Sequence, residues 1–98
     1  PNLDFDRIAS LRSALPIPLV LHGCSDIPPE QLQESVRLGM SKFNIATEIF
    51  ELAITVWYSM GIRLKEGDMF RLMMETSENA IDFVRGKMRL LNPNKFTF

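Results

Sequence analysis

The chain contains a single cysteine, a single histidine and no apolar run long enough to cross a membrane. Cys24 therefore lacks a partner for an intramolecular disulfide, which suits a reducing compartment such as the cytoplasm. Neither sign of charge is in excess, because 11 Lys and Arg residues balance 12 Asp and Glu residues. This balance argues against nucleic-acid binding driven by surplus positive charge. Residues 1–4 do not resemble a signal peptide, so no membrane partner is predicted either.

What the chain does contain is typical of a small folded unit. Hydrophobic residues make up 46% of the 98 residues, too large a share for a disordered protein. Ninety-eight residues are close to the lower size at which one hydrophobic core suffices. We therefore treat residues 1–98 as one segment.

The middle of the chain is predicted to form a strand, a helix and a second strand. Residues 17–21 are almost continuously apolar, as in a strand that is buried on both faces. Residues 22–26 then become small and polar. A proline pair at 28–29 suits the first turn of a helix, and Gly39 suits its end. Residues 43–46 are predicted to form the second strand, parallel to the first.

Three further helices are predicted from apolar residues at helical spacing. The first has Asp4 or Asp6 available as its amino-terminal cap. The second begins at Thr47 as its cap and is apolar almost all round, so neighbours are expected to bury it on several sides. Asp68 opens the third, and Asn92 begins a loose tail. The predicted ranges are 4–15, 47–60 and 68–91.

Two parallel strands and about four helices define an α/β segment that is incomplete on its own. Parallel strands are nearly always buried on both faces, and each open edge exposes unpaired backbone groups. The leading interpretation is the last quarter of a (β/α)8 TIM barrel, since a closed barrel has no edges. A doubly wound open sheet that lacks some strands is the alternative.

Three segments resemble the carboxyl-terminal part of class II, zinc-dependent ketose-bisphosphate aldolases, which include the fructose- and tagatose-1,6-bisphosphate aldolases. They are LDFDRI at 3–8, IPLVLHGCSDIP at 17–28 and LGMSKFNIATE at 38–48. The motifs are specific in combination, because His-Gly-x-Ser follows one strand and Asn-Ile-x-Thr follows the next. The resemblance covers essentially the whole chain and implies that the two strands are the seventh and eighth of a barrel.

The resemblance implies a cytoplasmic lyase of carbohydrate metabolism, for example in glycolysis. Such an enzyme cleaves or forms a carbon–carbon bond in a phosphorylated ketose, giving dihydroxyacetone phosphate and an aldehyde. His22 matches a zinc ligand of the family, and zinc polarises the ketone as a Lewis acid. Without the resemblance, a lone histidine at a strand end is more often a hydrogen-bonded structural residue.

Four further residues match substrate contacts of the family. Gly23 and Ser25 match the loop that binds a substrate phosphate. Thr47 matches a phosphate contact at the start of a helix, where the helix dipole favours an anion. Asn44 matches a residue that holds the substrate near the metal. Purely structural roles stay open as alternatives: Ser25 as a capping residue and Asn44 as a hydrogen-bonded core amide.

Two residues of the loop depart from the usual His-Gly-Gly-Ser-Gly. Cys24 replaces its third residue, either as a neutral substitution or as a second soft metal ligand. Asp26 replaces a glycine that would allow positive φ, so a strained backbone is expected there. Its carboxylate would also weaken phosphate binding, unless Asp26 turns outward to cap the next helix.

The other zinc ligands and the catalytic aspartate of the family have no match in this chain. A catalytic zinc normally needs three protein ligands, and one imidazole cannot supply them. We therefore expect these 98 residues alone not to catalyse aldol cleavage. The alternative function is a non-catalytic, truncated aldolase-like module that self-associates through open strand edges and apolar helix faces. A homo-oligomer is expected in either case.

Overall fold

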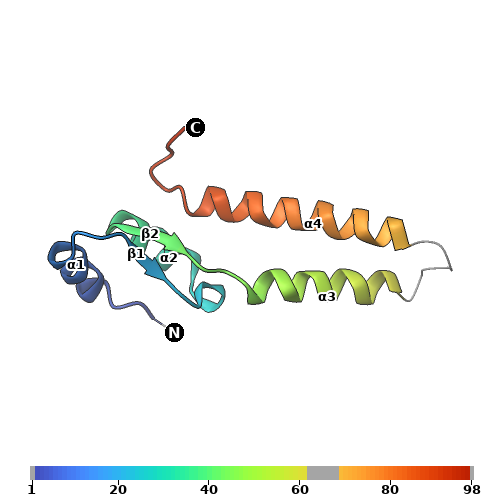
Figure 1. Ribbon diagram of the computed structural model, residues 1–98, viewed down its shortest axis with the longest axis horizontal. Coiled ribbons are helices and arrows are strands. Elements are labelled where there is room, and N and C mark those ends of the chain that lie inside the picture. The colour runs from blue at the N-terminus through green and yellow to red at the C-terminus, as the bar shows by residue number, and fades with distance from the viewer. Residues whose placement is uncertain (1, 62–68, 98) are drawn as a thin grey trace. The chain divides into compact units, whose positions relative to one another are not determined.

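The structure is a computed structural model that describes residues 2–61 and 69–97. These residues form four α-helices and two parallel strands in one sheet, as predicted (Figure 1). In chain order the elements are α1 (Phe5–Ala14), β1 (Leu19–Leu21), the 3-10 turn η1 (Cys24–Asp26), α2 (Pro29–Arg37), β2 (Met40–Phe43), α3 (Thr47–Gly61) and α4 (Met69–Leu90). The chain divides into two compact units, one of residues 1–45 with 87–98 and the other of residues 46–86.

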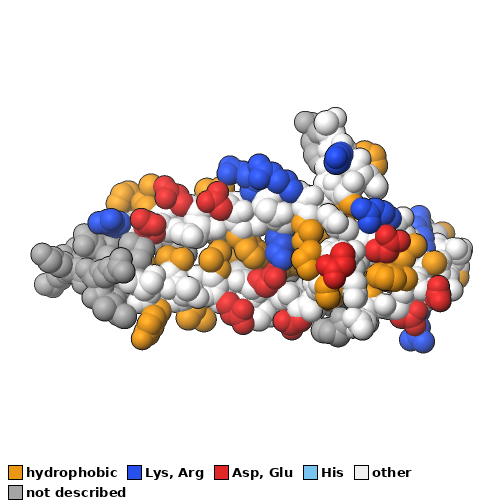
Figure 2. All heavy atoms as spheres, turned by 180° about the vertical axis from the view of Figure 1, so that it is seen from behind, with side chains coloured by type: hydrophobic (Ala, Val, Ile, Leu, Met, Phe, Trp, Pro, Cys, Tyr) orange, Lys and Arg blue, Asp and Glu red, His pale blue; other side chains and the backbone are white. Residues whose placement is uncertain are grey.

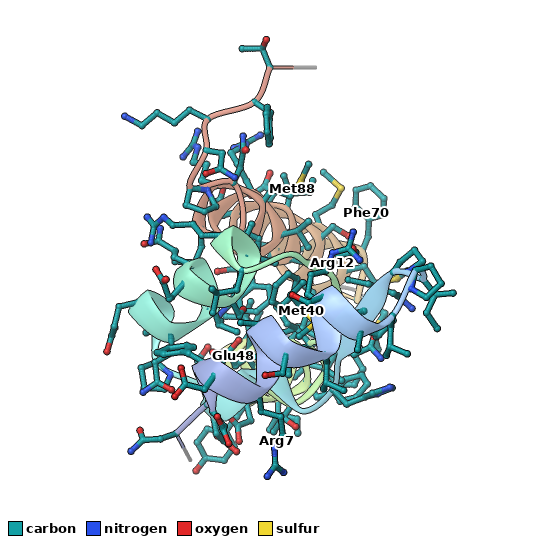
Figure 3. The ribbon with its side chains drawn as sticks, turned by 90° about the vertical axis from the view of Figure 1, so that its left-hand side faces the viewer. Arg7, Arg12, Met40, Glu48, Phe70 and Met88 are labelled. Carbon is teal, nitrogen blue, oxygen red and sulfur yellow. The ribbon has the colours of Figure 1, made fainter. Side chains whose placement is uncertain are left out.

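Helix α1 begins after Asp4, so Asp4 is the amino-terminal cap, and of the two candidates, Asp4 and Asp6, it is the one that caps the helix. Asp4 Oδ1 accepts a hydrogen bond from the backbone N–H of Arg7 at 2.9 Å. The face that α1 buries is narrower than predicted, because Ile8 is buried while Leu11 and Leu15 are exposed. Figure 3 shows Arg7 pointing away from the body of the protein, whereas Arg12 lies on the side of Met40.

Gln31 of α2 fixes the amino-terminal segment that precedes α1. Its Oε1 accepts a hydrogen bond from the backbone N–H of Leu3 at 2.8 Å. Its Nε2 donates to Oδ1 of Asn2 at 2.9 Å. One side chain therefore satisfies a donor and an acceptor of a segment that has no regular secondary structure of its own.

The two strands pair in parallel, with Leu19 opposite Met40 and Leu21 opposite Phe43. The second strand thus occupies 40–43, and the predicted range of 43–46 is wrong. The apolar character of residues 43–46 suggested that range, but backbone pairing decides where a strand lies. Lys42 pairs with Val20 although its polar side chain is exposed, and the register shifts between Leu19 and Val20. Within the described residues the first strand is not buried on both faces, since Val20 is 44% exposed. Alternate side chains point to opposite faces, and only the face of Leu19 and Leu21 is half-covered.

Gly39 connects α2 to β2 in a conformation that favours glycine. Its φ is +104°, and its N–H donates to the carbonyl oxygen of Val36 at 3.0 Å. A Cβ atom at this position would lie 2.8 Å from Cδ of Arg12. Gly39 therefore serves both the helix end, as predicted, and the close approach of α1.

The core of the first unit is centred on Cys24, Ile27 and Leu32. Half-buried side chains from the amino-terminal segment, both strands and the end of α4 pack around them, namely Leu3, Leu21, Phe43, Ile45, Leu90 and Leu91. The loop that follows β1 is thus anchored by a buried cysteine side chain. This anchor fixes where the neighbouring loop residues lie.

The second unit contains α3 and the greater part of α4, which lie side by side (Figure 1). Nε1 of Trp57 donates to Oγ1 of Thr76 at 2.9 Å, and this hydroxyl donates to the carbonyl oxygen of Leu72 at 2.8 Å. The expectation that neighbours bury α3 on several sides is not met within the described residues. Figure 2 shows hydrophobic side chains at the surface of the protein. The large apolar side chains that are exposed on these two helices include Phe50, Ile54, Trp57, Tyr58, Met69, Phe70, Met73, Met74, Ile81 and Val84.

The predicted connection at 62–67 and the helix start at Asp68 lie outside the described residues. Helix α4 is described from Met69 onward and ends at Leu90, within one residue of the predicted end. No helix among the described residues has the length and apolar character of a membrane span.

The segment after α4 is a hydrogen-bonded turn, so the prediction of a loose tail is wrong. Asn92 Oδ1 accepts from the N–H of Phe96 at 3.0 Å, and Asn92 Nδ2 donates to the carbonyl oxygen of Phe96 at 2.8 Å. The N–H of Lys95 donates to the carbonyl oxygen of Asn92 at 3.0 Å. An asparagine side chain that bonds the nearby backbone is a common way to stabilise a turn.

Candidate functional site

His22 and Asn44 are brought together because each directly follows a strand of the parallel pair. The last residues of the two strands, Leu21 and Phe43, are opposite each other. Nδ2 of Asn44 lies 2.9 Å from Nδ1 of His22, within hydrogen-bond distance. The carboxyl ends of parallel strands meet at one edge of a sheet, which is where α/β proteins carry their binding sites.

The backbone of Asn44 is fixed on both sides. Its N–H donates to the carbonyl oxygen of Leu21 at 2.9 Å, and its own carbonyl oxygen accepts from the N–H of Cys24 at 3.2 Å. These bonds extend the strand pairing past the end of the sheet. Asn44 thereby links the end of β1 to the loop after it, and its side chain is left to orient the imidazole.

Two arrangements of the amide satisfy the contact with Nδ1 of His22. With the amide nitrogen towards the ring, Nδ1 accepts a hydrogen bond and Nε2 carries the ring hydrogen. With the amide turned by half a rotation, Nδ1 donates to Oδ1 and Nε2 offers a free lone pair. The second arrangement is the one that a metal bound through Nε2 requires, because the bond made by one ring nitrogen sets the role of the other.

The loop after His22 turns at Gly23, not at Asp26. Gly23 has φ of +66°, and no atom would contact a Cβ there. Asp26 ends the 3-10 turn η1, and its φ is not positive, so the strain expected there is absent. Asp26 does not cap α2 either, because Pro28 occupies the cap position and no side chain caps it. Ser25 is half-buried in the same turn.

Cys24 is fully buried in the core, which leaves its sulfur inaccessible as a metal ligand. Its Sγ donates to the carbonyl oxygen of Leu21 at 3.1 Å. Burial raises the pKa of the Cys24 thiol, whereas the hydrogen bond from Asn44 and the charge of Lys87 act in the opposite direction. A protonated, buried thiol behaves as a small apolar side chain, which supports the interpretation of Cys24 as a neutral substitution.

Thr47 is the first residue of α3 and is exposed. It is not the residue that precedes the helix, since the carbonyl oxygen of Ala46 accepts hydrogen bonds from the N–H groups of Ile49 and Phe50, each at 3.1 Å. The predicted cap is therefore one residue out of place. Thr47 belongs to the second unit, whereas His22, Gly23, Ser25 and Asn44 belong to the first.

Among the described residues, His22 is suited to be one ligand of a metal ion that needs further ligands. His22 is exposed at a strand end, and an amide holds its ring, as is common for metal-binding histidines. Among the described residues, no three His, Cys, Asp or Glu side chains are grouped so as to hold a metal ion. A zinc ion bound here would therefore take its remaining ligands from residues other than these.

The family model of the class II fructose-bisphosphate aldolases matches residues 1–95 of the chain. The chain belongs to this family. The crystal structure of the YdjI aldolase from Escherichia coli K12 is similar to it, with a TM-score of 0.85 and 26% sequence identity. That alignment covers 97% of this chain and 36% of the YdjI chain. The chain thus spans about a third of the length of this aldolase, and its fold matches part of an aldolase.

One functional relationship was missed at the level of sequence. The sequence motif places Asn44 next to the substrate and does not indicate its contact with His22. Part of the signal was present, because His22 is the first polar residue after the apolar run of β1 and Asn44 directly follows the last residue of β2. Finding it required the register of the strand pair, which the sequence left uncertain.

Proposed function

We propose that this chain is part of a zinc-dependent class II aldolase. The reaction is cleavage or formation of a carbon–carbon bond in a phosphorylated ketose of the tagatose- or fructose-1,6-bisphosphate type. Its products are dihydroxyacetone phosphate and an aldehyde. The family supports an aldolase, and the hydrogen-bonded pair of His22 and Asn44 at the ends of adjacent strands is the observation that carries the assignment of the site.

His22 would hold the metal in this site. Zinc, when bound, polarises the ketone of the substrate and stabilises negative charge on its oxygen. Asn44 keeps the imidazole ring in one orientation, and with its Oδ1 towards Nδ1 it would leave Nε2 free for the metal. Its backbone bonds to Leu21 and Cys24 prevent the amide from moving away.

The loop at Gly23 and Ser25 would bind a phosphate of the substrate. The left-handed conformation of Gly23 leads directly into the turn η1 that contains Ser25. Such turns, together with a hydroxyl, are suited to anions. Thr47, in the first turn of α3, would bind phosphate through its hydroxyl and the amino-terminal N–H groups of that helix.

We further propose that the protein is a cytoplasmic homo-oligomer of carbohydrate metabolism, with no nucleic-acid or membrane partner. The exposed apolar side chains of α3 and α4 support self-association, because large apolar patches commonly mark protein interfaces. The same observation favours the second candidate, a truncated aldolase-like module that self-associates without catalysis.

The test is zinc-dependent cleavage by the protein expressed from its complete reading frame. We expect release of dihydroxyacetone phosphate from fructose- or tagatose-1,6-bisphosphate, and loss of that release after chelation. His22→Ala should lower zinc content and activity together, and the exposed residue Lys42 provides the control variant Lys42→Ala. Full zinc content in His22→Ala would overturn the assignment of this ligand.

The 98 residues expressed alone test the expected inactivity of the fragment, whereas the complete reading frame distinguishes the two candidates. A fragment of an aldolase should release no triose phosphate, because one imidazole cannot retain a catalytic zinc. If the complete reading frame also yields an oligomer without cleavage activity on either bisphosphate, the non-catalytic module is the correct interpretation.

A further inference from the structure

A cavity lined mainly by cationic and amide side chains lies in the first unit, outside the loop that carries His22. Its volume is about 540 Å³, and it is lined by Gln33, Arg37, Arg89, Asn92, Pro93, Lys95 and Phe96. Three of these side chains are cationic, two are amides and none is a carboxylate. The residues come from α2, from the last turn of α4 and from the turn that follows it.

Hydrogen bonds of Asn92 fix the wall formed by Lys95 and Phe96. Both polar atoms of its side chain bond the backbone of Phe96, and its carbonyl oxygen accepts from Lys95. Lys95 has φ of +54°, the single positive value among non-glycine residues that the structure describes. Lysine rarely adopts this conformation, so the turn holds the chain in an unfavourable geometry that places Lys95 at the cavity.

The charges of the cavity are only partly balanced by neighbouring side chains. Arg37 pairs with Glu34, with 3.3 Å between Nη1 and Oε2. Arg89 and Lys95 form no ion pair with a carboxylate in the part of the chain that the structure describes. Like charges around a concave surface reinforce one another's potential, and a bound anion would relieve their repulsion.

We propose that this cavity binds a small phosphate-bearing molecule. Arginine side chains bind phosphate oxygens in a bidentate manner, and lysine adds a point charge. The cavity is within the range of volumes usual for small-molecule sites, so it has room for more than an inorganic ion. The exposed ring of Phe96 offers an apolar surface to the rest of the molecule.

Two of the three cations of the cavity have another physical role, but this role does not explain the position of the third. Arg37 and Arg89 lie in the last turns of α2 and α4, where positive charge complements the helix dipole. Lys95 lies beyond both helices, in a turn that holds it in a rarely adopted backbone conformation. Complementing the dipole at a helix end therefore does not explain why Lys95 is held in this conformation.

The test is to titrate the purified protein with pyrophosphate and to measure binding by calorimetry at low and at high salt. We expect Arg89→Gln and Lys95→Gln each to weaken binding at least threefold, and binding to weaken further as salt rises. Glu34→Gln frees Arg37 from its carboxylate and should strengthen binding. Arg7→Gln is the matched control, because Arg7 is an exposed cation of the same unit that does not line the cavity.

The loop at Gly23 and Ser25 is a second place at which pyrophosphate could bind, and Ser25→Ala separates the two. Binding that Ser25→Ala abolishes and Lys95→Gln leaves unchanged would overturn the cavity proposal while supporting the proposed function. Equal weakening by Arg7→Gln and Lys95→Gln would show only a general effect of net charge, which also overturns it. Circular dichroism of each variant checks that the turn and helices are retained.

Discussion

The side-chain amide of Asn44 lies 2.9 Å from Nδ1 of His22, across two strands that pair in parallel. The residue assigned to the metal and the residue assigned to the substrate are therefore one hydrogen-bonded unit. Any change at Asn44 alters the orientation of the imidazole as well as the polar surface next to it. This coupling gives Asn44 a measurable effect that does not depend on substrate.

Replacing Asn44 by alanine should weaken zinc binding by about 10- to 100-fold, the usual effect of removing a group that orients a metal-bound histidine. Competition between the protein and a chromophoric chelator measures this without substrate. Asn94→Ala is the control, since Asn94 is an exposed amide in the turn after α4. Unchanged zinc affinity in Asn44→Ala would show that the imidazole is held by other means.

Replacing Gly39 by alanine should destabilise the protein by about 1–3 kcal/mol, the cost of a side chain in a sparsely populated backbone region. The new Cβ would also contact Cδ of Arg12 at 2.8 Å, although a flexible arginine can move. Urea denaturation measures the change. Combining it with Arg12→Ala should recover only a small part of the loss, because the φ of +104° remains.

Gly86→Ala is the matched control for that experiment. Gly86 lies inside α4, has no positive φ, and no atom would contact its Cβ within 4 Å. Alanine should stabilise the helix by about 0.5–1 kcal/mol, because glycine loses more backbone freedom on folding. The two substitutions should change the free energy of unfolding in opposite directions. Equal changes would contradict the argument from backbone conformation.

The stability of the protein should fall at alkaline pH because of Cys24. Burial raises the pKa of this thiol above its ordinary value of 9.0, so the folded protein retains the proton to higher pH than the unfolded chain. The free energy of unfolding therefore decreases as pH rises through and above that ordinary value. Below it, both states hold the proton and Cys24 contributes no pH dependence.

Cys24→Ala supplies the comparison for the pH experiment. The variant should be less stable by about 1 kcal/mol at neutral pH, because a buried sulfur loses its packing contacts. Its stability should then fall less steeply than that of the unmodified protein above pH 9.0. Parallel curves from denaturation at a series of pH values would show that other groups cause the alkaline loss.

Replacing Phe70 by aspartate should reduce self-association by at least about tenfold, a change of 1.4 kcal/mol in the free energy of assembly. Phe70 is 75% exposed on α4, among the apolar side chains of the second unit. Light scattering across a concentration series measures the effect. Ile17→Asp, at an exposed apolar residue of the first unit, should leave the association unchanged.

The order and type of the elements could be predicted because their signals are local. Asp4, the proline pair at 28–29 and Gly39 all mark helix ends as expected. The second strand was misplaced because its position depends on pairing with β1, and Lys42 is paired without being apolar. The turn at Asn92 was missed since its bonds come from one side chain to nearby backbone.

The residues of the candidate site could be predicted from the sequence, but the contacts between them could not. His22 and Asn44 were both selected, and the bond between them depends on strand register. At Asp26 the expected strain was wrong because the left-handed residue of the loop is Gly23. A deviation from a motif does not show which residue of a loop takes the unusual conformation.

The first unit is assembled from two stretches that are far apart in the chain. Leu90 and Leu91 pack against the core around Cys24, Ile27 and Leu32, whereas the whole second unit lies between these stretches in sequence. During translation, residues 1–45 therefore leave the ribosome before the side chains that complete their core have been made. The apolar surface around Cys24 is therefore not fully covered until α4 has been synthesised, and uncovered apolar surface of this kind favours misassembly.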